Sequence, residues 1–153
     1  KTKTKCYICV APEKSLDMMI DSEDKITIKR NKFLPIIPAL KLAQFIDLKD
    51  IDVVHFHWTR DIATVILAKV LSKKKPKIVQ SRHMRMTRFK DDFYHKWLYS
   101  HIDTIHAVTY EVEKQLKEYI PVDVRPNIEM VYLGIDGPSI SKTKVMQLKD
   151  RYN

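Results

Sequence analysis

DVVHFH, residues Asp52–His57, is the stretch of sequence that decides the fold. With the preceding isoleucine it forms a dense apolar run, Ile51–Phe56, which predicts a β-strand covered on both faces. Strands of this kind belong to parallel sheets, whose faces are packed with helices. The stretch therefore predicts the centre of an α/β domain.

Further runs with apolar residues on either side of this strand predict five more strands. They cover Lys5–Val10, Lys25–Lys29, Ile78–Ser81, Ile102–Val108 and Glu129–Leu133. Amphipathic helix patterns separate most of these runs, and they extend from about Pro35 to Leu48, from Asp61 to Lys73, over Asp91–Ser100 and from Thr109 to Tyr119. Strands that alternate with helices predict right-handed crossovers. We therefore expect a Rossmann-like parallel sheet with helices on both faces.

The chain has 153 residues, which is the length of a single domain. We expect the Rossmann-like domain to occupy residues 1–138, and a linker or helix leading toward a further domain to begin over residues 139–153. No apolar run approaches the 18 residues of a membrane span, and no signal-peptide pattern follows Lys1. Together with the sparse use of cysteine, these features favour a cytoplasmic protein.

The charge balance is strongly basic, with a formal net charge of +9 and a pI near 9.5. Such an excess predicts an anionic partner, which could be nucleic acid, an anionic membrane surface or an acidic substrate. Helix-turn-helix, finger and RNP patterns are absent, so nucleic acid is the least favoured of these. With only two glycines, Gly134 and Gly137, the chain has no Gly-rich phosphate loop over most of its length, and we predict no cofactor.

The two cysteines, Cys6 and Cys9, have the C-x-x-C spacing of redox and zinc sites. They fall on a predicted strand, where residues three apart point to opposite faces, so we expect two ordinary buried thiols. His55 and His57 share one face of their strand, but a zinc site needs further ligands. The nearest candidates for further ligands, His83 and the two cysteines, do not have the spacing of a zinc site, so we predict no metal.

The residues that follow the predicted strands carry most of the chemistry. In an open parallel sheet, ligands bind outside the carboxyl ends of the strands. The relevant segments are His55–Trp58, Ser81–His83, Ala107–Thr109 and Tyr132–Asp136. Three of the four bring polar or ionisable groups to the same edge, where we expect the site.

Four segments, in the same order and with similar spacing, resemble patterns of family 4 glycosyltransferases, the retaining group with the GT-B fold. Asp52–His57 resembles D-V-[IV]-H-x-H, Lys77–His83 a strand ending in T-x-H, Asp103–Thr109 the pattern D-x-[IV]-[IV]-A-V-S, and Met130–Asp136 the pattern V-I-x-N-G-[IV]-D. The resemblance covers about residues 50–136. It implies one Rossmann-like half of a GT-B enzyme.

The sequence also departs from this family. Lys5–Val10 resembles the family's second strand, so the first strand and its Gly-rich loop are missing. Leu133-Gly134 stands where the family has Asn-Gly, and the C-terminal domain, with its E-x7-E motif, is absent. The resemblance therefore implies an acceptor-side domain that is inactive by itself.

The function implied by the resemblance is transfer of a hexose-type sugar from a nucleotide-sugar to a glycan or lipid-linked acceptor in the synthesis of cell-envelope polysaccharide or glycoconjugates. The missing domain would bind most of the donor, and the family needs no bound metal. His83 matches the histidine of T-x-H and is the candidate catalytic residue, near the donor sugar. The candidate acceptor-binding residues are His57, Trp58, Arg82, Arg85, Arg88 and Thr109.

Each of these residues also has a structural interpretation. His83 fits an exposed loop histidine, Thr109 fits the N-cap of a helix, and His55 fits a hydrogen-bonded core histidine. The basic stretch Arg82–Lys90 and the aromatic residues of Phe93–Tyr99 fit a solvated loop and a core-facing stripe. Alternatively, this segment contacts an anionic or lipid-linked acceptor at the inner face of the membrane.

Two other functions remain open for the whole chain. A sugar-nucleotide epimerase of the GT-B fold would also place histidines at strand ends, and an E-x7-E motif in the second domain would instead favour transfer. A basic nucleic-acid-binding module would use the net charge, and its affinity would fall steeply with salt.

Overall fold

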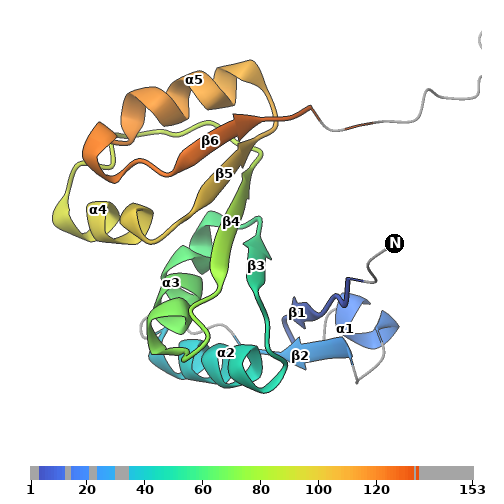
Figure 1. Cartoon of the computed structure of the whole chain (residues 1–153). Helices are drawn as coiled ribbons and strands as arrows, with labels where there is room; N and C mark the ends of the chain where they lie inside the picture. Colours follow the sequence, from blue (N-terminus) through green and yellow to red (C-terminus); the bar gives the residue numbers. More distant parts are fainter. Residues whose placement is uncertain (1–3, 13–14, 21–23, 30–34, 133, 135–153) are drawn as a thin grey trace, which may run out of the picture.

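Two parallel sheets form the framework of the computed structural model, which describes residues 4–12, 15–20, 24–29, 35–132 and 134 (Figure 1). The smaller sheet pairs β1 (Ile8–Val10) with β2 (Lys25–Thr27). The larger sheet has the order β3 (Val53–Phe56), β4 (Lys77–Arg82), β5 (Thr104–Ala107) and β6 (Asn127–Met130). Because every pair is parallel, the carboxyl ends of these four strands lie at one edge.

Helices connect the strands and flank the sheets. They are α1 (Ser15–Met19), α2 (Ile36–Leu48), α3 (Ile62–Leu71), α4 (Phe93–Ser100) and α5 (Tyr110–Tyr119), with short 3-10 helices η2 (Thr59–Asp61) and η3 (Val122–Val124). In the part of the chain that the structure describes, no helix combines the length and apolar character that a membrane span requires. The alternation of strands and helices confirms the predicted α/β class.

The N-terminal ends of α4 and α5 are capped by side chains. Asp92 accepts a hydrogen bond from the amide of His95 at 3.1 Å, and Thr109 accepts one from the amide of Val112 at 3.3 Å. Each bond satisfies an amide that has no partner within its own helix. The interpretation of Thr109 as an N-cap is therefore confirmed.

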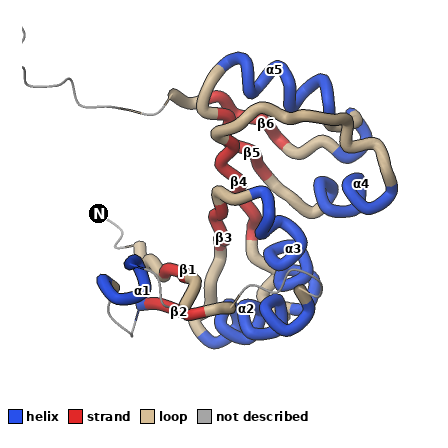
Figure 2. Tube along the Cα trace, turned by 180° about the vertical axis from the view of Figure 1, so that it is seen from behind, coloured by secondary structure: helices blue, strands red, loops and turns tan. Residues whose placement is uncertain are grey.

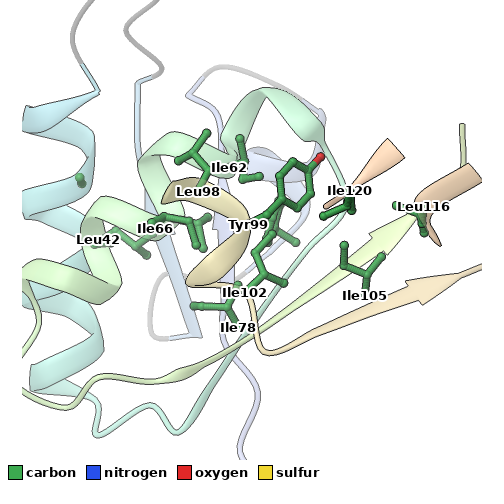
Figure 3. Packing of buried hydrophobic residues seen from close by; sticks show 14 of the residues in the cluster. Leu42, Ile62, Ile66, Ile78, Leu98, Tyr99, Ile102, Ile105, Leu116 and Ile120 are labelled. Atoms are coloured by element: carbon green, nitrogen blue, oxygen red, sulfur yellow. The ribbon is translucent and has the colours of Figure 1, made fainter. Parts of the chain in front are cut away.

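Apolar residues of α2, α3, α4 and α5 share one core with the larger sheet (Figure 3). Ile78 and Ile105 enter this core from the neighbouring strands β4 and β5, and both are fully buried. The helices contribute Leu42, Ile66, Leu98 and Leu116. Burying a side chain of this size stabilises the fold by roughly 1.5–3 kcal/mol, so the core fixes the four helices against the sheet.

The prediction that the DVVHFH strand is covered on both faces is wrong. Val53 is 53% exposed and His55 is also exposed, whereas Phe56 is buried. The cause is the position of β3 at the edge of the larger sheet, where a groove of about 660 Å³ lies between it and β1. The lining residues include Ile8, Cys9, Phe45 and Val53.

Both cysteines are exposed free thiols, which corrects the prediction that they are buried. They lie at this groove because the smaller sheet is separate from the larger one. Enough protein surrounds the Cys9 thiol that burial, reinforced by the negative charge of Asp61, raises its pKa to about 11. Cys9 is therefore a poor nucleophile at neutral pH, since the thiolate is the reactive form.

The last strand begins earlier than the apolar pattern predicts. β6 starts at Asn127, whose amide donates to the carbonyl of Asp103 at 3.2 Å, whereas the predicted range was Glu129–Leu133. Pairing with β5 sets the residue at which β6 begins, and the pattern of apolar side chains carries no information on that pairing. Leu133, Asp136 and the predicted linker at 139–153 lie outside the described residues, and helix α1 was not predicted.

Asp103 joins three elements at the end of the larger sheet opposite the carboxyl edge. Its carboxylate accepts hydrogen bonds from Lys69 Nζ of α3 at 2.7 Å, Lys77 Nζ at 2.8 Å and the Ile78 amide at 2.8 Å. Burial acts to raise the pKa of Asp103, but these bonds outweigh it and lower the pKa to about 2. The carboxylate therefore stabilises the junction of α3, β4 and β5.

Candidate functional site

His57 and His83 directly follow the carboxyl ends of β3 and β4. Side chains alternate along a strand, so residues two apart share a face, and this brings both rings to the same face of the sheet. His57 Nδ1 lies 3.2 Å from His83 Nε2, and the ring centroids are 5.5 Å apart. Both residues are exposed. The structure thus brings together two candidates that are 26 residues apart in the sequence.

Behind this pair, three side chains form a connected set on the same face. His55 Nε2 lies 2.8 Å from Ser81 Oγ, which lies 3.0 Å from His106 Nδ1. His106 Nε2 lies 2.7 Å from the carbonyl oxygen of Val131, just after β6. The ring of His55 also lies 4.6 Å from that of His57. Polar groups at all four strand ends are therefore linked.

His55 is hydrogen-bonded, as its interpretation as a core histidine predicts, but it is exposed rather than buried. His55 is among the residues that line the groove beyond β3. The partial burial that remains lowers its pKa, and the neighbouring His57, His106 and His83 lower it further because like charges would repel. These effects favour an uncharged His55 at neutral pH.

Arg82 is buried, and its guanidinium is used within the protein. Nε donates to the carbonyl of Met84 at 2.9 Å, Nη2 donates to the carbonyl of Arg85 at 3.3 Å, and Nη1 donates to Thr59 Oγ1. These bonds fold the chain back directly after β4 and hold it to η2. The structure therefore places Arg82 beneath the surface on which Arg85 is exposed.

The loop between β4 and α4 runs alongside α5 (Figure 2). The Met86 amide donates to Gln115 Oε1 at 3.1 Å, and the rings of Phe89 and Tyr119 lie 4.7 Å apart. Burial, followed by the positive charges of Arg88 and Arg82, lowers the pKa of Lys90. The loop is thus anchored to α5 rather than detached from the domain.

The aromatic residues near this loop divide into two groups. Leu98 and Tyr99 of α4 are buried in the core, as the stripe interpretation predicts. In contrast, Phe93 is 87% exposed, and Tyr94 and Phe89 are exposed as well. The interpretation of the whole segment as a core-facing stripe is therefore correct only for the second half of the helix.

The other candidates are more scattered. Trp58 is 68% exposed beside His57, Arg88 is exposed on the loop, and Thr109 is exposed at the start of α5. Among the described residues, no cluster of three or more histidine, cysteine or acidic side chains is placed to hold a metal ion. The most closely grouped candidates are His57 and His83.

Ser81 and His106 were not among the predicted site residues, although Ser81 begins the segment Ser81–His83 that was expected at the ligand edge. Both residues lie within strands rather than after them. The available signal was the alternation of side chains along each strand. It places His55, Ser81 and His106 on the same face of the sheet once the register of the strands is known. That signal can be used only when the register is known.

Comparison with known proteins relates this arrangement to one family. The family model described as Glycosyltransferase Family 4 matches residues 20–137. No curated protein sequence matches significantly. The crystal structure of a glycosyltransferase from Rickettsia africae ESF-5 is similar, with a TM-score of 0.63 and 19% sequence identity. The similarity covers 94% of this chain but only 40% of that one, and at this identity it shows the fold.

Proposed function

The chain belongs to glycosyltransferase family 4, and from this premise we propose that it is the acceptor-side half of a GT-B enzyme. The complete enzyme transfers a hexose-type sugar from a nucleotide-sugar to a glycan or lipid-linked acceptor. The observation that carries the proposal is the His57–His83 pair at the carboxyl edge, where parallel sheets bind ligands. The chain spans well under half of the similar structure, which is consistent with a second, donor-binding domain.

His83 has the chemistry that the proposed role requires. An exposed imidazole at a strand end can hydrogen-bond a sugar hydroxyl or stabilise charge that develops in the transition state. Its contact with His57 restricts the ring before any ligand binds, so less ordering is needed on binding. The donor diphosphate is held by the other domain, so this chain alone does not turn over.

The groove beside β3 supports the proposal that a first strand, as in the family fold, would lie between β1 and β3. Within the described part of the chain, no strand pairs with the outer edge of β3, and β1 pairs only with β2. A groove lined by β1, β3 and α2 separates the two edges. A strand inserted there would join the two sheets into one.

The loop after β4 supports the proposal that the acceptor is anionic or lipid-linked. Arg85 and Arg88 are exposed, and so are the rings of Phe89 and Phe93 further along the same segment. Arginine can pair with phosphate through two hydrogen bonds, and aromatic rings suit a membrane interface. We expect sedimentation with anionic vesicles at low salt, reduced severalfold in Arg85→Ala/Arg88→Ala. Equal binding to neutral vesicles would count against this acceptor.

The decisive experiment for the function is the substitution His83→Ala in a polypeptide that carries both domains. We expect the transfer rate to fall about 10²-fold to 10³-fold, as when one preorganised donor is removed from an active site. His95→Ala is the matched control, because that histidine pairs with Asp92 on α4. Wild-type transfer by His83→Ala would overturn the assignment.

A further inference from the structure

A row of hydrogen bonds crosses the larger sheet behind the His57–His83 pair. We call it the polar row, and it consists of His55, Ser81, His106 and the carbonyl of Val131. Ser81 is its centre, with a relative exposure of 2%. A hydroxyl buried to this degree needs partners within the protein, and the two rings supply them.

The direction of the hydrogen bonds follows from their last acceptor. The carbonyl oxygen of Val131 can only accept, so His106 Nε2 carries a hydrogen. Nδ1 of the uncharged ring then has a lone pair and accepts the hydroxyl hydrogen of Ser81. The Ser81 oxygen is left to accept from Nε2 of His55. All three donors therefore point toward β6.

We propose that Ser81 and His106 are positioning residues that hold the ring of His55 and, through it, set the His57–His83 contact at the site. The contacts that transmit this effect are short. The ring of His55 lies 4.6 Å from that of His57, whose Nδ1 lies 3.2 Å from His83. The inference deepens the proposed function and rests on it, because it gives the polar row a role through His83.

The direction of the polar row depends on where the ring hydrogens lie. A hydrogen on Nδ1 of His106 would turn this atom into a donor facing Ser81, and the Ser81 hydroxyl would then have to donate to Nε2 of His55 instead, which reverses the row. His106 also occupies a position where the resembling pattern D-x-[IV]-[IV]-A-V-S has an aliphatic residue, so that pattern alone does not predict the polar row.

The experiment uses imidazole NMR on the 153-residue chain, which needs no substrate. In the wild type we expect the hydrogen on Nε2 of both His55 and His106, and a ring-to-ring NOE between His57 and His83. In Ser81→Ala this NOE should lose at least half its intensity, whereas Ser81→Thr, which keeps the hydroxyl, should restore it. His106→Leu should reproduce the effect of Ser81→Ala, and the signals of His95 should stay unchanged in all variants.

Two results would overturn the inference. One is a wild-type chain in which Nε2 of His55 lacks a hydrogen or Nδ1 of His106 carries one, because either arrangement reverses the polar row. The other is an unchanged NOE in Ser81→Ala and His106→Leu, with circular dichroism showing that both variants are folded.

Kinetics separate this inference from the proposed function. In a polypeptide that carries both domains, Ser81→Ala should lower kcat about tenfold with little change in KM, because a misplaced group weakens transition-state contacts. A rise in KM alone would contradict a positioning role. If the NOE changes as expected but His83→Ala transfers normally, the positioning of the rings stands and the function assigned to His83 fails.

Discussion

Replacing Asp103 by asparagine should destabilise the domain through the junction of α3, β4 and β5. The substitution keeps the shape of the side chain but removes the charge that Lys69 and Lys77 share. The lowering of the Asp103 pKa from its ordinary value of 3.8 to about 2 corresponds to about 2.4 kcal/mol. The side chain is 23% exposed and Lys77 is mostly solvated, so screening reduces the expected loss to about 1–2 kcal/mol.

The pH dependence of this loss follows from the direction of the pKa shift. A carboxyl group whose pKa is lowered by folding contributes its full stability above the unfolded pKa, near 3.8. The contribution disappears as pH falls toward 2, where folded Asp103 becomes protonated. The difference between the wild type and Asp103→Asn should therefore be constant from pH 5 to pH 7 and shrink between about pH 4 and pH 2.

Urea unfolding followed by tryptophan fluorescence and circular dichroism measures this difference. Asp52→Asn is the matched control, because Asp52 is 80% exposed and, among the described residues, pairs with Lys74 at 3.0 Å, so its loss should stay below about 0.5 kcal/mol. Equal losses for the two variants at pH 7 would refute the reasoning. A loss in Asp103→Asn that persists undiminished at pH 2 would refute it as well.

Three smaller predictions concern single positions and are measured by the same unfolding assay. Gln80 is fully buried, and neither polar atom of its side chain has a hydrogen-bond partner among the described residues, so Gln80→Met should raise stability by about 1–3 kcal/mol. A decrease would reveal a partner for the amide. Thr109→Ala should cost about 1 kcal/mol by uncapping α5, while Thr109→Ser should cost far less. The backbone at Lys75 has a φ of 52°, a left-handed conformation that favours glycine. Lys75→Gly should therefore stabilise the domain by up to about 1 kcal/mol, and a loss of stability would contradict this expectation.

The sequence was sufficient to predict the order of most elements and the edge of the sheet at which the candidate residues His57 and His83 meet. Alternating apolar runs and helix patterns locate β3 to β5 and α2 to α5, because local periodicity follows the burial of one face. The strand-end rule then selects His57 and His83 without reference to any contact. Their meeting at 3.2 Å follows from the parallel pairing of two adjacent strands.

Features that depend on register or on loop conformation could not be predicted. The link between Ser81 and His106 requires knowing which residues of β4 and β5 are neighbours. The burial of Arg82 requires the loop after β4 to turn its carbonyls back toward the guanidinium. The exposure of Val53 depends on what lies beyond the edge of β3, and a run of β-branched residues carries no information on that.

The groove between β1 and β3 separates the smaller sheet from the larger one, and we expect the two sheets to unfold independently. The contacts across it include an edge-to-face packing of Tyr7 on Phe45 at 5.5 Å, whereas the strands from β3 to β6 share a continuous set of backbone hydrogen bonds. Amide protons of β1 and β2 should therefore exchange with solvent by local opening, long before those of β4 and β5 exchange by global unfolding. We therefore expect β1 and β2 to form a folding unit that is separate from the larger sheet and weaker than it.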